Sequence, residues 1–196
     1  MPKTLPKKIL FLLVYLTSFL YSFHWALPLY IESSFISQFL PTEKFIGLIF
    51  SFAAVFTVIA TFFLPRALRR FGNYRTTLTI MGAEIFSLII LAIFSNPAAG
   101  LASQIISVGF FIAHQVLVNI IFLNLDYFVE AFTENEKTGS MRGVFMTVLN
   151  IAVAVAPFVA GLILSDHNFG KIYIAGAVFM GLGFFVIARY FKDYED

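Results

Sequence analysis

The hydrophobic residues of this chain come in long uninterrupted blocks, separated by short segments with charges or turn residues. Such blocks are apolar on every side, as expected for helices surrounded by lipid rather than water. A helix needs about 20 apolar residues to cross the hydrocarbon core of a bilayer. The blocks that reach this length predict six membrane-spanning helices, at about residues 9–30, 45–64, 76–95, 99–124, 143–165 and 172–190.

Two of these boundaries depend on local sequence. The run from Ile80 to Phe122 has Glu84 as its single charged residue and is too long for one span, but the turn sequence SNPAAG divides it. The first block follows three lysines, as the core of a signal peptide would. It is longer than such a core and lacks a small-residue cleavage site before Pro28. We therefore expect residues 1–196 to form a single six-helix transmembrane domain.

The composition agrees with a membrane protein and narrows the chemistry. Hydrophobic residues make up 60% of the chain and charged residues 12%, whereas soluble domains carry about 25% charged residues. The absence of cysteine excludes disulfides, thiolate metal sites and a cysteine nucleophile. No serine-protease turn, His/Asp/Glu metal cluster or phosphate-binding glycine loop is evident. We therefore expect no enzyme, no cofactor, no metal site and no nucleic-acid partner.

The basic residues predict the orientation in the bilayer. With six spans, eleven lysines and arginines fall on one side of the membrane, and only Lys44 and Lys171 fall on the other. Cytoplasmic loops carry an excess of basic residues. We therefore expect a multi-pass plasma (inner) membrane protein with both termini in the cytoplasm.

Small residues and a proline recur along the fifth predicted helix, at Gly143, Ala152, Ala156-Pro157 and Ala160-Gly161. This spacing resembles the helix 5 motif of the major facilitator superfamily, with alanine in place of glycine at three positions. Small residues let another helix approach closely, and a proline bends the helix. Generic helix packing is the alternative interpretation.

The segment from Pro65 to Tyr74 resembles the loop that joins the second and third helices in the same superfamily. Arg70 and Gly72 match the pattern, whereas Pro65 replaces a glycine and Arg69 replaces an acidic residue. In the superfamily this acidic residue helps to hold the cytoplasmic side closed. Arg69 does not supply the carboxylate for this contact. The alternative is a plain cluster of inside-facing basic residues, namely Arg66, Arg69 and Arg70. The stretch 136–143 also resembles the superfamily's sequence at the start of helix 5.

Together these features resemble the N-terminal six-helix half of a major facilitator transporter, a bundle of two inverted three-helix repeats. The resemblance implies a secondary active transporter that moves a small solute by alternating access. A second six-helix half would come from the same longer chain or from a homodimer. It would pack through the second and fifth helices, so Ala152, Ala156 and Ala160 would face it. The alternative is a non-transport six-helix membrane protein, such as an assembly partner or an inactive half-transporter.

Polar residues align on the first and fourth predicted helices, which line the central cavity in the resembled fold. Interhelical hydrogen bonding that only holds the bundle together is the alternative for each of them. The candidate substrate-cavity residues are Thr17, Tyr21, His24, Gln104, His114, Gln115 and Asn119.

Glu84 lies near the middle of the third predicted helix. A charged carboxylate at the bilayer centre costs roughly 2.5–3.5 kcal/mol, so this side chain should be protonated, paired or facing water. Glu84 and His24 are the candidates for proton coupling, since imidazole ordinarily titrates near neutrality. The alternative is a neutral Glu84 that is hydrogen-bonded to a neighbouring helix, because the third helix is peripheral in the resembled fold.

Overall fold

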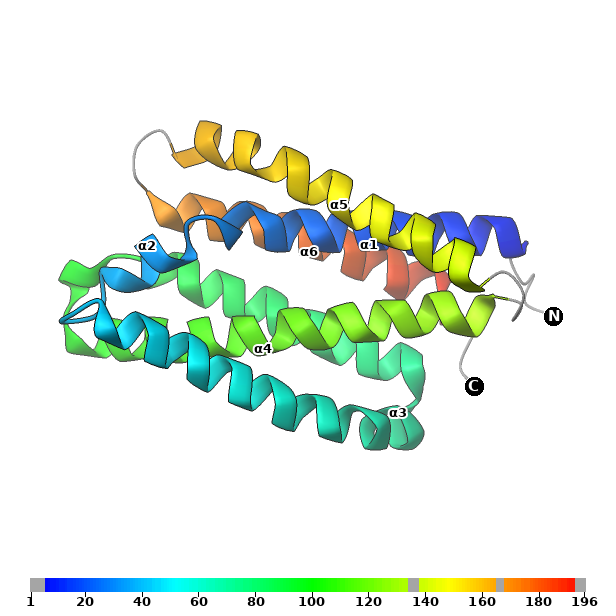
Figure 1. Cartoon of the computed structure of the whole chain (residues 1–196), viewed down its shortest axis with the longest axis horizontal. Coiled ribbons are helices and arrows are strands. Elements are labelled where there is room, and N and C mark those ends of the chain that lie inside the picture. The colour runs from blue at the N-terminus through cyan, green and yellow to red at the C-terminus, as the bar shows by residue number, and fades with distance from the viewer. Residues whose placement is uncertain (1–5, 134–137, 165–167, 193–196) are drawn as a thin grey trace.

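The computed structural model of the chain describes residues 6–133, 138–164 and 168–192, and every regular element in these ranges is helical. The long helices run side by side along the molecule (Figure 1). This confirms the predicted all-α class. The elements are α1 (Lys7–Leu29), α2 (Glu32–Ser37), α3 (Lys44–Ile93), the 3-10 turn η1 (Pro97–Ala99), α4 (Leu101–Phe132), α5 (Thr138–Ile163) and α6 (Phe169–Tyr190).

The element α3 consists of two helical segments joined at Gly72. Gly72 has φ 75° and ψ 164°, a conformation that is strained for residues with a Cβ atom but open to glycine. The chain reverses there, and the second segment runs back along the bundle (Figure 1). The loop that we expected between residues 64 and 76 is therefore a single-residue break. The helices long and apolar enough to cross a membrane are α1, α3, α4, α5 and α6, and the two segments of α3 account for the sixth predicted span.

A short helix that the sequence pattern did not predict, α2, lies at one end of the bundle. Its residue Phe35 is fully buried and packs against Phe39, Phe111 and Tyr173, with ring centroids 5.1, 6.3 and 4.7 Å away. The first residue of α2, Glu32, is also buried. This helix therefore brings a carboxylate into the interior of the bundle.

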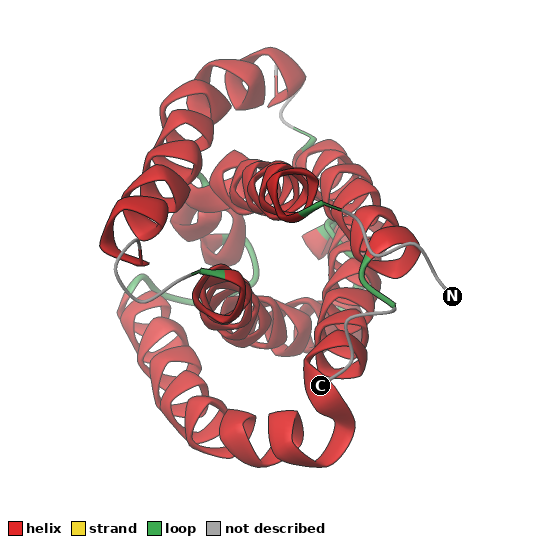
Figure 2. Ribbon diagram, turned by 90° about the vertical axis from the view of Figure 1, so that its right-hand side faces the viewer, coloured by secondary structure: helices red, strands yellow, loops and turns green. Residues whose placement is uncertain are grey.

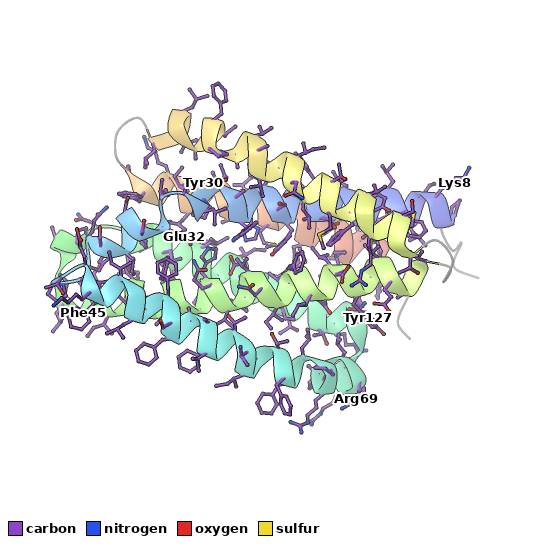
Figure 3. All side chains as sticks on the ribbon, in the orientation of Figure 1. Lys8, Tyr30, Glu32, Phe45, Arg69 and Tyr127 are labelled. Atoms are coloured by element: carbon purple, nitrogen blue, oxygen red, sulfur yellow. The ribbon has the colours of Figure 1, made fainter. Side chains whose placement is uncertain are left out.

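The opposite end of the bundle holds the start of α1, the break at Gly72 and the end of α6 (Figure 1). Lys8 and Arg69 lie at this end, whereas Phe45 lies at the other (Figure 3). This arrangement places the basic residues at the start of α1 and around Gly72 at the same end, as the positive-inside argument requires. The orientation relative to a membrane stays a prediction.

The small residues of α5 face α1 within this chain. Ala152, Ala156 and Ala160 are buried and pack in one cluster with Phe23 and Leu27 of α1. The prediction that these alanines face a second six-helix half is therefore wrong, because α1 already fills the groove. The other residues of the motif, namely Gly143, Pro157 and Gly161, are exposed.

The remaining surface of the long helices is strongly apolar. The first segment of α3 exposes a series of large side chains that includes Phe52, Phe56 and Phe62. Seen along the bundle axis, this segment lies at the periphery (Figure 2). Exposed apolar side chains in this number are expected on a surface that contacts lipid or another helical unit.

Candidate functional site

A cavity of about 570 Å³ lies between α1, α3, α4 and α5. Its wall combines aromatic and aliphatic side chains with a few polar groups, a composition typical of small-molecule sites. The polar and amphipathic residues of the wall are Tyr21, Ser22, Trp25, Glu32, Gln115, Asn119 and Asn150.

Three of the predicted cavity residues line this space, namely Tyr21, Gln115 and Asn119. The Tyr21 hydroxyl donates to the carbonyl of Val118 over 2.8 Å, and the Asn119 amide donates to the carbonyl of Gln115 over 2.8 Å. The buried Gln115 Nε2 has no hydrogen-bond partner among the described residues. Because this atom is buried, the Gln115 amide would have to turn into the cavity before it could donate to a bound molecule.

The other predicted cavity residues lie elsewhere. Thr17 is fully buried, and its hydroxyl has no partner among the described residues. Gln104 is half-buried and does not line the cavity. His24 and His114 are fully buried and turn toward Glu84.

Glu84 is fully buried and lies within hydrogen-bonding distance of both histidines. Its Oε1 atom lies 3.1 Å from His24 Nε2 and 2.6 Å from His114 Nδ1. The three residues come from α1, α3 and α4, and one ligand atom from each lies within 4.8 Å of the others. We call these residues the His–Glu–His cluster. The expectation that no His/Asp/Glu cluster exists is therefore wrong.

The remaining ring nitrogens of the cluster also face oxygen atoms. His24 Nδ1 donates to the backbone carbonyl of Tyr21. His114 Nε2 lies 3.8 Å from Oε1 of Glu32. Because Glu32 also lines the cavity, it stands between the cavity and the His–Glu–His cluster. Tyr173 closes this region, with its ring edge-on to that of His114 at a centroid distance of 6.2 Å.

Sequence reasoning missed this cluster because its members are far apart in the chain. Glu84 is 60 positions from His24 and 30 positions from His114. One signal was available, since each of the three is an ionisable residue inside an apolar span, and such residues commonly pair with one another. The proposed role of Glu84 and His24 in proton coupling stays a prediction.

Comparisons with known proteins agree with this architecture. A sequence profile of the Major Facilitator Superfamily matches residues 9–196. This chain belongs to the major facilitator superfamily. It is accordingly a multi-pass helical membrane protein, as the apolar helices also indicate.

A solved structure shares the superfamily fold with this chain. It is the crystal structure of a bacterial homologue of the iron transporter ferroportin in an inward-facing state, with a TM-score of 0.77 and 18% sequence identity. The match covers 92% of this chain and 45% of that protein, so the chain spans less than half of that protein's length. A search of curated protein sequences found no match.

The segment from Pro65 to Tyr74, which resembles the superfamily's loop between helices 2 and 3, lies at the end of the bundle that holds the start of α1. Arg69, Arg70 and Gly72 line a depression of about 470 Å³ there, together with Tyr127 of α4 (Figure 3). Arg66 lies over the rings of Phe62 and Phe63, 5.3 and 5.2 Å from their centroids.

A second contact at this end involves the stretch 136–143, which resembles the superfamily's sequence at the start of helix 5. Residues 136 and 137 lie outside the described residues. Arg142 forms a two-pronged ion pair with Asp126, with Arg142 Nε 2.9 Å from Asp126 Oδ1. The pair joins α4 to α5.

Proposed function

We propose that this chain forms a six-helix half of a secondary active transporter, which moves a small solute across the membrane by alternating access. The observation that carries the proposal is the cavity between α1, α3, α4 and α5, lined by polar residues of α1 and α4. In rocking-type transporters the substrate site lies between two repeats near the bilayer midplane. A second six-helix half, in the same longer chain or in a second copy, would supply the opposite wall.

The lining of the cavity suits recognition of a small polar solute. Gln115 Nε2 is buried without a partner among the described residues. Leaving a buried donor unsatisfied costs about 1–3 kcal/mol, and a turn of the Gln115 amide toward a bound solute that accepts its hydrogen bond would offset the cost. Trp25 and Phe122 add aromatic side chains to the wall of the cavity.

The experiment asks whether the cavity holds water. The chain contains no cysteine, so single cysteines can be placed at Gln115 and Asn119 and treated with a small hydrophilic thiol reagent in membranes. Both should react. Matched controls at Leu12, which is exposed on α1, and at Leu91, which is fully buried, should not react. If all four positions are equally protected, the polar residues serve helix packing and the proposal fails.

A further inference from the structure

We propose that His24, Glu84 and His114 form a binding site for a divalent transition-metal ion of the Zn²⁺ and Co²⁺ class. The site lies beside the transport cavity and is separated from it by Glu32. This proposal does not depend on transport, because it concerns only what the His–Glu–His cluster binds.

The hydrogen-bonding roles of His24 point to a cation next to Glu84. A carbonyl oxygen only accepts hydrogen bonds, so the contact with Tyr21 requires a proton on His24 Nδ1. A neutral His24 then presents an unprotonated Nε2 to the Glu84 carboxylate 3.1 Å away. Two acceptors at this distance repel each other unless a proton or another positive charge lies between them. A metal ion bound by Nε2 and the carboxylate supplies that charge.

A divalent ion would also balance the charge of the two carboxylates in the region. Glu32 and Glu84 are both buried, and the sequence has no lysine or arginine between Lys8 and Lys44 or between Arg75 and Lys137. One divalent cation neutralises the two carboxylates while both imidazoles stay neutral. Protons on both imidazoles would instead place two imidazolium rings with centroids 6.3 Å apart in the apolar interior, whereas protons on the carboxylates would leave the region neutral without a metal ion, a case that the Co²⁺ titration distinguishes. Burying two like charges so close together is costly.

The donor atoms fit a transition metal better than magnesium or calcium. Two imidazoles and one carboxylate form the donor set that zinc uses in many catalytic sites, whereas the harder ions prefer oxygen alone. Ligand atoms around a tetrahedral ion with bonds of about 2.0 Å stand roughly 3.3 Å apart. The distance from Glu84 Oε1 to His24 Nε2, 3.1 Å, is close to this value, whereas the distance from Glu84 Oε1 to His114 Nδ1, 2.6 Å, is shorter, so these two atoms must move apart to bind one ion. The second carboxylate oxygen, Glu84 Oε2, is buried without a partner among the described residues and is free to coordinate.

Both histidines also have the outer partners that metal ligands usually have. The second ring nitrogen of a metal-bound histidine commonly donates to a carbonyl or carboxylate, which fixes the orientation of the ring. His24 Nδ1 donates to the carbonyl of Tyr21. His114 Nε2 faces the carboxylate of Glu32 at 3.8 Å. Neither Glu32 Oε1 nor His114 Nε2 has a hydrogen-bond partner among the described residues, so a small movement would join them.

The test is titration of the full chain with Co²⁺, purified without a polyhistidine tag. Nitrogen and oxygen ligands in tetrahedral geometry give Co²⁺ intense visible absorption, and Zn²⁺ should abolish the signal by competition. We expect one Co²⁺ per chain. Absence of the visible bands in the folded wild-type protein would overturn the proposal.

Substitutions then assign the signal to residues. Glu84→Gln and His114→Asn should lose the Co²⁺ bands, and Glu32→Gln should weaken the affinity by about 10- to 100-fold, as expected for an outer partner. The chain has three histidines, and His167 is the one outside the His–Glu–His cluster. The matched control, His167→Asn, should therefore leave the signal unchanged. Retention of the bands in a folded Glu84→Gln variant would place the metal elsewhere and refute the site.

If the variants do not fold, a measurement on the wild-type protein can still identify the ligands of the bound metal ion. X-ray absorption at the zinc edge of the loaded protein counts the imidazole ligands of the bound ion. The proposed site predicts two imidazoles with oxygen completing the shell. A spectrum with one imidazole or none would exclude the His–Glu–His cluster as the binding site.

Discussion

At the scale of single residues, the His–Glu–His cluster is centred on Glu84, which contacts both histidines. The cost of placing a carboxylate in an apolar span already showed from the sequence that Glu84 needs a partner or water. The identity of the partners did not follow, because the contacts with His24 and His114 bridge 60 and 30 positions of the chain. Helical periodicity gives the face on which a residue lies, but not the helix that this face meets.

A second buried polar contact provides a test of the same physics. Asn124 of α4 donates to the hydroxyl of Thr77 of α3, and both side chains are buried. In Thr77→Val the Asn124 amide loses its acceptor, and its Oδ1 already has no partner among the described residues. We expect the free energy of unfolding to fall by about 1–3 kcal/mol, measured by denaturant titration in detergent. Thr79→Val, at an exposed position of the same helix, is the matched control and should change it little.

At the scale of single helices, α5 shows what sequence spacing can and cannot specify. The stripe of small residues was recognisable from sequence spacing alone, as was its use for close helix approach. The helix that occupies the groove was assigned incorrectly to a second six-helix half, because spacing specifies a groove but not its occupant. In the structure, Phe23 and Leu27 of α1 pack against Ala152, Ala156 and Ala160.

This packing predicts how substitutions along α5 differ. Ala156→Leu places a larger side chain into the filled contact with α1 and should lower the free energy of unfolding by about 1–3 kcal/mol. Ala154→Leu makes the same change at an exposed position of the same helix and should alter stability by less than about 0.5 kcal/mol. Denaturant titration of the two variants under identical conditions checks the difference. Equal stability of both would show that the α1–α5 contact is loosely packed.

At the scale of the whole molecule, the hydrophobic blocks predicted six spans, and the described residues form six long helical segments. Two features escaped prediction for physical reasons. The helix α2, with 6 residues, is too short for a periodic pattern to be detected. The reversal at Gly72 needs a single residue with positive φ, whereas the run of arginines around it suggested a longer loop.

The predicted orientation has its own test. Ser140 and Gln38 are both exposed. Ser140 belongs to the first turn of α5 and Gln38 directly follows α2, and the start of α5 and α2 lie at opposite ends of the bundle (Figure 1). With the termini in the cytoplasm, an impermeant thiol reagent should modify Ser140→Cys only from the cytoplasmic side and Gln38→Cys only from the outside. Reversed labelling of the pair would invert the assignment of every loop.

The most direct test of alternating access is the sidedness of labelling at Asn119, which is exposed on the wall of the cavity. Asn119→Cys is reconstituted into liposomes, and an impermeant thiol reagent is supplied either outside the liposomes or trapped within them. A transporter that opens its cavity to each side in turn predicts modification from both sides, while Ser140→Cys and Gln38→Cys each react from one side. Modification of Asn119→Cys from one side only, or from neither, would contradict the proposal that this chain is half of an alternating-access transporter.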